Sequence, residues 1–176
     1  LRAKDTCCCN TGWGEDSGSG RLNARLRWQV ELAPPVPISP ALSNTANGHF
    51  YALFSPATWT WSERAAVALG GHLTTLRSQA EENWVTNAFG RFGGTNHLLW
   101  IGLNDVATEG SFVWSSGEPV TFTFWAPGEP NNALGGEDFA AIYPPGHSRA
   151  GQWNDWGERV IDGNGPFHGV GEFVPP

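Results

Sequence analysis

Cysteine is almost absent from this chain, because its only three cysteines, Cys7, Cys8 and Cys9, are adjacent to one another. Adjacent cysteines cannot cross-link distant segments, so the sequence excludes an internal framework of disulfide bonds. Charged residues make up 15% of the chain, with 10 basic against 17 acidic residues. The sequence contains no cluster of basic residues of the kind that binds nucleic acids, and no apolar run reaches the roughly 18 residues of a membrane span. We therefore expect neither a nucleic-acid partner nor insertion into a membrane.

Glycine, proline and tryptophan are abundant instead, with 23 Gly, 13 Pro and 10 Trp among 176 residues, of which 40% are hydrophobic. This composition suits one globular domain with many turns rather than a disordered chain. Four tryptophans lie in or beside apolar runs: Trp100, Trp114, Trp125 and Trp153. We interpret them as core residues, and a platform on which a ligand stacks is the alternative.

The first 46 residues differ from the rest of the chain. They contain the cysteine triplet, a glycine-rich run over 12–20 and a proline-rich run over 34–40. We predict a poorly ordered leader or linker over 1–46 and a folded domain over 47–176. An unpaired tail is the favoured interpretation of the triplet, with metal binding or lipidation as alternatives.

Two short helices are predicted by capping boxes, at Thr60-Trp61-Ser62-Glu63 and at Ser78-Gln79-Ala80-Glu81. Gly70-Gly71 and Gly90 are positioned to end them. Short apolar or alternating runs predict strands over 49–54, 98–103, 112–114, 120–125, 139–143 and 169–174. Helices followed by strands predict an α+β domain with an antiparallel sheet.

The acidic residues between 100 and 160 are concentrated in loops. They occur at Asp105 and Glu109, in the segments 129–132 and 137–138, and beside an asparagine at 154–155. Carboxylates interleaved with amides are hard oxygen donors, which suit Ca²⁺, whereas the histidine and thiolate ligands typical of zinc are missing from these segments. A solvated acidic surface is the alternative interpretation.

The motifs in this region, taken in order, resemble those of the C-type lectin domain. They are Gly70-Gly71-His72-Leu73, Trp100-Ile101-Gly102-Leu103, Glu129-Pro130-Asn131, Glu137-Asp138 and Trp153-Asn154-Asp155. The resemblance covers residues 48–176. It is greatest to cysteine-free bacterial lectin-like domains, which begin and end like residues 47–51 and 169–173 here. It implies a C-type lectin-like α+β fold, with two short helices flanking small antiparallel sheets and a long calcium-binding loop region.

The resemblance also implies a calcium site that binds sugar. Its ligands would be Glu129, Asn131, Glu137, Asn154 and Asp155, with Pro130 in the cis form. Two vicinal sugar hydroxyls would coordinate the ion directly and hydrogen-bond to the same side chains. The order Glu-Pro-Asn implies mannose-type specificity, for mannose, GlcNAc, fucose or glucose.

A second calcium site is implied at Asp105, Glu109, Asn132 and Asp138, with Glu137 shared. Asn132 stands where a carboxylate is usual in the family, so this site would carry one negative charge fewer. Two other departures are the missing disulfides, with Ala66 and Phe139 at positions where half-cystines are common, and an insertion at 144–149. The insertion would lie beside the first site and either tune the ligand or lengthen a hairpin.

The resemblance implies a calcium-dependent lectin module and not an enzyme. A calcium-stabilised protein-binding or adhesion domain without sugar binding is the alternative. A glycosidase is disfavoured, because metal ligation would keep Glu129 and Glu137 ionised, whereas acid–base catalysis needs one raised pKa. We expect a glycan partner, an extracellular or cell-surface location, and multivalency through oligomers or a larger parent chain.

Overall fold

The fold is described here from a computed structural model over residues 34–133 and 135–175. The cysteine triplet and most of the predicted leader lie outside the described residues. The helices are α1 (Trp59–Ala68), α2 (Gln79–Phe89) and a short 3-10 helix, η1 (Phe92–Gly94). The strands are β1 (Leu42–Ser43), β2 (Phe50–Pro56), β3 (His72–Leu73), β4 (Leu98–Asn104), β5 (Val113–Trp114), β6 (Phe139–Ile142), β7 (Trp153–Trp156), β8 (Ile161–Asp162) and β9 (Gly165–Phe173).

Only one of the two predicted helix caps is correct. At α2, the Ser78 side chain accepts a hydrogen bond from the backbone N–H of Glu81, as the capping box predicts. At α1, the cap is Thr58 and not Thr60, so the helix begins earlier than predicted. The Thr60 N–H instead donates to Glu158 at 2.9 Å, and Glu63 accepts from the Leu73 N–H at 2.8 Å. Two threonines on either side of Trp59 offer competing caps, and the pattern alone selected the wrong one.

The main sheet is mixed, with strand order β1-β2-β9-β4-β6-β7. β4 and β9 run parallel, with Leu98 opposite Phe167, whereas the other pairs are antiparallel. The α+β class is therefore correct, but the expectation of a purely antiparallel sheet is wrong. The difference arises because the last strand inserts between β2 and β4, so that strands distant in the sequence become neighbours.

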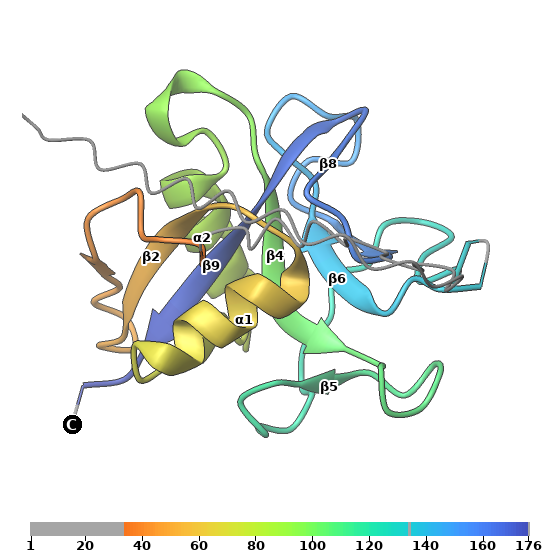
Figure 1. Cartoon of the computed structure of the whole chain (residues 1–176), viewed down its shortest axis with the longest axis horizontal. Helices are drawn as coiled ribbons and strands as arrows, with labels where there is room; N and C mark the ends of the chain where they lie inside the picture. The colour runs from red at the N-terminus through yellow and green to blue at the C-terminus, as the bar shows by residue number, and fades with distance from the viewer. Residues whose placement is uncertain (1–33, 134, 176) are drawn as a thin grey trace, which may run out of the picture. The chain divides into compact units, whose positions relative to one another are not determined.

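Strand β4 is buried on both faces, which explains its continuous apolar sequence. Alternate residues point to opposite sides. Leu99, Ile101 and Leu103 pack with Val85 and Phe89 of α2, whereas Leu98 and Trp100 pack with Trp59 of α1. The two helices thus cover opposite faces of the sheet, and Figure 1 shows α1 in front of β9 with α2 behind it.

The tryptophans belong mostly to these two cores. Trp100, Trp114 and Trp153 are buried, which confirms their interpretation as core residues, and Trp125 is half-buried with its ring against Trp153. The strand predicted over 120–125 is wrong, since only an isolated bridge from Trp125 to Trp153 forms there. Phe122 and Phe124 still pack against the core, so the segment is apolar without pairing as a strand.

The loops between β4 and β6 occupy residues 105–138, and β5 is the one regular element among their described residues, 105–133 and 135–138. At the other end of the domain, β1 pairs with β2, with Leu42 opposite Tyr51, so the sheet also uses residues before position 47. Over residues 34–133 and 135–175, no helix is both long and apolar enough to cross a membrane.

Candidate functional site

Asp155 on β7 fastens the loop that carries the Glu-Pro-Asn motif. Its carboxylate is buried and accepts the backbone N–H groups of Asn131, at 3.0 and 3.1 Å, and of Asn132, at 2.7 Å. Trp125 forms a bridge with Trp153 on the same strand, which holds the start of this loop against β7. Residues separated by more than 20 positions are thereby brought together at one end of the sheet.

Glu129 is covered by two neighbouring side chains. Its bond to Pro130 is cis, as the resemblance implies. One carboxylate oxygen accepts a hydrogen bond from the Asn131 side-chain amide, and the other accepts from Nη1 of Arg149 at 2.9 Å. Arg149 lies in the loop between β6 and β7, so the predicted insertion reaches the predicted site. The Glu129 side chain is only 7% exposed as a result.

Glu137 lies just before β6 and has a raised pKa, first because it is buried and also because Asp155 and Glu129 are negatively charged neighbours. Its Oε2 accepts from the Ala133 N–H at 2.9 Å, and Nη2 of Arg159 lies 4.0 Å from its Oε1. The Asn132 side-chain oxygen accepts from the Gly136 and Glu137 N–H groups, at 2.6 and 3.1 Å. Asn132 therefore shapes the loop that presents Glu137.

Two buried oxygen atoms in this region lack a hydrogen-bond partner within the described part of the chain. They are Oδ1 of Asn154 and Oδ1 of Asp105. The other polar atom of each side chain is satisfied, since Asn154 donates to the Asp155 carbonyl at 2.9 Å and Asp105 accepts from the Gly110 N–H at 2.7 Å. A buried oxygen without a donor is costly unless a cation or water approaches it, and both atoms belong to predicted calcium ligands.

The carboxylates of this region repel one another. Burial raises the pKa of Asp105, and the charges of Asp138 and Asp155 raise it further. Desolvation also raises the pKa of Glu109, followed by the charges of Asp105, Asp138 and Asp155. We call the six acids of this region the loop cluster: Asp105, Glu109, Glu129, Glu137, Asp138 and Asp155. Such mutual repulsion is what a divalent cation relieves.

The predicted ligands nevertheless do not converge on a single metal position. Among residues 34–133 and 135–175, no three side chains of His, Cys, Asp or Glu are close enough to hold a metal ion together. Two of the five predicted first-site ligands are amides. Arginines contact the carboxylates of Glu129 and Glu137 at 2.9 and 4.0 Å. The residues present fit Ca²⁺ in number and type of donor, and binding would require Glu129 to exchange Arg149 for the ion.

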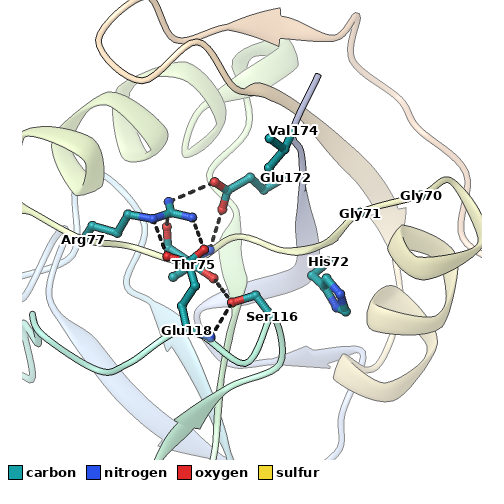
Figure 2. Close-up of a pocket in the computed structure, with 9 residues that line it drawn as sticks. All are labelled: Gly70, Gly71, His72, Thr75, Arg77, Ser116, Glu118, Glu172 and Val174. Carbon is teal, nitrogen blue, oxygen red and sulfur yellow. Dashed lines mark hydrogen bonds and ion pairs between the residues drawn. The ribbon is translucent and has the colours of Figure 1, made fainter. Parts of the chain in front are cut away.

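A second acidic cluster, which the sequence analysis missed, surrounds Arg77, and Figure 2 shows two of its acids, Glu118 and Glu172, beside the guanidinium. Nη1 of Arg77 lies 2.9 Å from both Glu81 and Glu172, and its Nε lies 2.8 Å from Glu118. Glu172 also accepts from the Thr75 N–H at 2.7 Å. We call Arg77, Glu81, Glu118 and Glu172 the Arg77 cluster. In the sequence Glu172 belongs to the final strand motif over 169–173, and no spacing rule points to Arg77 as its partner.

Three members of the Arg77 cluster, Arg77, Glu118 and Glu172, line a hollow of about 100 Å³. The side-chain oxygens of Glu81 and Glu172 all accept hydrogen bonds, from Asn47, Tyr51, Arg77, Thr74 and Thr75. Burial raises the pKa of Tyr51, and the charge of Glu172 raises it further, so its hydroxyl remains a donor. Within the described residues, each side-chain oxygen of Glu81 and Glu172 therefore has a hydrogen-bond partner, and the cluster is a structural network.

Comparison with known proteins identifies the family. The Lectin C-type domain model matches residues 55–158. C-type lectin domain family 17, member A, from Homo sapiens is 40% identical over 104 residues, which cover 58% of this chain and 25% of that protein. Lectin BRA-3 from Megabalanus rosa is 37% identical over 112 residues, or 62% of this chain and 64% of that one. This chain therefore spans only a quarter of the human relative.

Comparison with solved structures shows the same relationship at the level of the fold. The carbohydrate-recognition domain of cow CD23, solved in the presence of a GlcNAc2Man3 oligosaccharide, superposes with a TM-score of 0.60 at 26% identity. The match covers 78% of this chain and 99% of the bovine one. The predicted lectin-like α+β fold is thus correct. The relatives are C-type lectins, which bind carbohydrate and are not enzymes, in agreement with the prediction for this chain. The chain belongs to the C-type lectin domain family.

Proposed function

We propose that this domain is a calcium-dependent carbohydrate-binding module. Its calcium ligands are Glu129, Asn131, Glu137, Asn154 and Asp155, and it binds mannose-type sugars. The observation that carries the proposal is the buried Oδ1 of Asn154, which lacks a hydrogen-bond donor within the described residues. This oxygen belongs to the residue before Asp155, in a region where carboxylates repel one another. A cation would both coordinate this oxygen and relieve the repulsion between the carboxylates. A protein-binding role explains neither the buried oxygen nor the repulsion.

Each ligand residue has a distinct part in this proposal. Asp155 holds the backbone of Asn131 and Asn132, so the Glu-Pro-Asn loop and β7 lie beside each other. Bound calcium supplies positive charge and open coordination positions for two vicinal hydroxyls. Carboxylates only accept hydrogen bonds, whereas amides also donate. Glu129 beside Asn131 therefore offers an acceptor and a donor, and this order favours mannose, GlcNAc, fucose or glucose over galactose.

We also propose a second, structural calcium ion near Asp105, Glu109 and Asp138, with Glu137 shared. The free Oδ1 of Asp105 and the raised pKa values of Asp105 and Glu109, caused by desolvation and by neighbouring carboxylates, support it. The Asn132 side-chain oxygen already accepts two backbone N–H groups. Its contribution is therefore to hold the loop in place, rather than to supply charge as the carboxylate usual in the family would.

The biological setting is a proposal on the same footing. We infer an extracellular or cell-surface module of the cysteine-free bacterial-type branch, since no cysteine follows Cys9. We also infer that it works as part of a multivalent parent chain or oligomer, because one shallow sugar site binds weakly. The leader over 1–46 and the domain over 47–176 remain a predicted division, although Leu42–Ser43 already joins the sheet.

A glycan array with and without EDTA tests the proposal. We expect mannose-type glycans to be retained in Ca²⁺ and lost in EDTA. The double change Glu129→Gln with Asn131→Asp should move the preference toward galactose, because it reverses acceptor and donor. Glu118→Gln, outside the loop cluster, is the matched control and should leave the profile unchanged. Calcium binding without any EDTA-sensitive glycan would instead favour a calcium-stabilised adhesion domain.

A further inference from the structure

The loop between β6 and β7 holds Arg149 beside the proposed sugar site. Its turn is closed by backbone hydrogen bonds from Gln152 to Arg149, at 3.0 Å, and from Gly151 to Tyr143, at 3.1 Å. The His147 ring stacks on Tyr143 at 4.2 Å between centroids, and its Nδ1 accepts from the Arg149 N–H at 3.1 Å. The backbone of Arg149 is thus fixed, whereas its side chain is 38% exposed and able to change rotamer.

The Arg149 guanidinium and a calcium ion would compete for the same carboxylate, that of Glu129. Nη1 donates to Oε1 of Glu129 at 2.9 Å, and the Asn131 amide occupies the other oxygen. An ion ligated by Glu129 would share that carboxylate with a positive charge held at hydrogen-bond distance. Direct coordination therefore requires the guanidinium to leave Oε1.

We propose that Arg149 competes with calcium for Glu129 and, once displaced, forms a subsite for an anionic group on the bound sugar. This inference rests on the proposed function of the same site. The displaced guanidinium stays tethered beside the ion by the fixed backbone of its loop. A planar guanidinium binds a carboxylate or sulfate through two parallel hydrogen bonds. The module would then prefer acidic or sulfated sugars to their neutral parents.

The surroundings of Arg149 favour this second position. Burial raises the pKa of Tyr143, and the neighbouring positive charge of Arg149 opposes that rise, which places the guanidinium near a neutral phenol. The other arginine of the site has a different environment, since the Arg159 guanidinium lies 5.2 Å from the Trp156 ring and 4.0 Å from Glu137. Arg149 is therefore the cation that calcium has to displace.

Calcium affinity is the first test, and it needs no sugar. Calorimetric titration of CaCl₂ into the full chain should give a roughly two- to fivefold lower Kd for Arg149→Gln than for wild type, the range expected from an exposed ion pair. Arg149→Lys keeps the charge and should stay near wild type. Arg91→Gln removes the same charge from η1's exposed start and serves as the matched control.

Sugar preference is the second test, with glucose, glucuronic acid and glucose 6-sulfate as probes in saturating Ca²⁺. All three have the same ring hydroxyls at positions 3 and 4, and the last two add a carboxylate or a sulfate. We expect wild type to bind the anionic sugars about three- to tenfold more tightly than glucose. Arg149→Gln should lose that ratio and keep its affinity for glucose. A preference for only one of the two anions identifies which group the subsite takes.

The outcomes separate the two proposals. If the calcium Kd is the same in Arg149→Gln as in wild type, or if wild type binds neither anionic sugar more tightly than glucose, the role of Arg149 is overturned while calcium and glucose binding leave the lectin proposal intact. Absence of calcium binding in wild type would overturn both.

Discussion

The Arg77 cluster and the loop cluster differ in what their carboxylates face. In the Arg77 cluster, one guanidinium contacts Glu81, Glu118 and Glu172, and hydrogen bonds satisfy the remaining oxygens of the two buried acids. In the loop cluster, arginines contact Glu129 and Glu137, whereas Asp105 and Glu109 have other carboxylates as their charged neighbours. Oδ1 of Asp105 lacks a donor within the described residues.

The difference is visible in the direction of the pKa shifts. Arg77 holds the pKa of Glu118 below its usual value through a hydrogen bond and its charge. In the loop cluster, burial and neighbouring acids raise the pKa values of Asp105 and Glu137. In the Arg77 cluster one cation contacts three acids and stabilises the fold. Among the described residues, no arginine pairs with Asp105, and that part of the loop cluster is prepared for a cation from solution. Acid content alone therefore does not identify a metal site.

The largest effect should come from removing the cation of the complete cluster. Arg77→Ala leaves the carboxylates of Glu81 and Glu172 buried without their positive partner, and the loss should be about 3 kcal/mol in the free energy of unfolding. Urea unfolding in EDTA measures it, with Arg91→Ala as a control that should change stability by less than about 0.5 kcal/mol. A small loss for Arg77→Ala would show that the two acids tolerate burial alone.

The next effect is the addition of calcium to the incomplete cluster. At a free concentration one hundred times Kd, Ca²⁺ should stabilise wild type by about 2.7 kcal/mol. Asp155→Asn should abolish this gain, because it removes a proposed ligand and weakens the hold on the Glu-Pro-Asn loop. Arg77→Ala should keep the full gain, since the two clusters share no partner. Equal gains in wild type and Asp155→Asn would contradict the proposed site.

The sequence predicted the parts of this molecule that depend on local patterns. The α2 cap and the run 98–103 follow from capping chemistry and apolar periodicity, and both appear as expected. The run 120–125 had the same apolar character without becoming a strand, because Trp125 alone bridges to β7. The parallel pairing of β4 with β9 depends on where the last strand inserts, which no local pattern specifies.

The candidate site shows the same limit. Motif order identified Glu129, Asn131 and Asp155, and the fold brings their loop and strand together. The contact of Arg149 with Glu129 was not predicted, since the insertion at 144–149 indicated either an effect on the ligand or a longer hairpin, and no contact of any one residue. The Arg77 cluster joins residues from α2's start, the loop after β5 and the last strand, so its charges match only in three dimensions.

A change of pH should also distinguish the two clusters, with a smaller effect on the free energy of unfolding than the addition of calcium. Because the pKa values of Asp105 and Glu137 are raised, protons compete with Ca²⁺ above the usual carboxyl range, and from pH 7 to 5 the calcium gain should lose a part of its roughly 2.7 kcal/mol. The pKa of Glu118 is lowered, so its contribution is present above the unfolded value and is lost only as pH falls through the folded one. The difference between wild type and Glu118→Gln should thus stay constant between pH 7 and 5 in thermal unfolding scans.

The smallest effect is also the sharpest comparison, because one chemical change should have opposite signs in the two clusters. In EDTA at pH 7, Asp105→Asn should raise the free energy of unfolding by about 0.5 kcal/mol, since it removes a charge that Asp138 and Asp155 repel. Glu118→Gln should lower it by a similar amount, since it removes an exposed partner of Arg77. In Ca²⁺ the sign for Asp105→Asn should reverse, because the lost charge then weakens the proposed second ion. A destabilising Asp105→Asn in EDTA would mean that its carboxylate is already balanced by the fold, and the contrast between the clusters would fail at that residue.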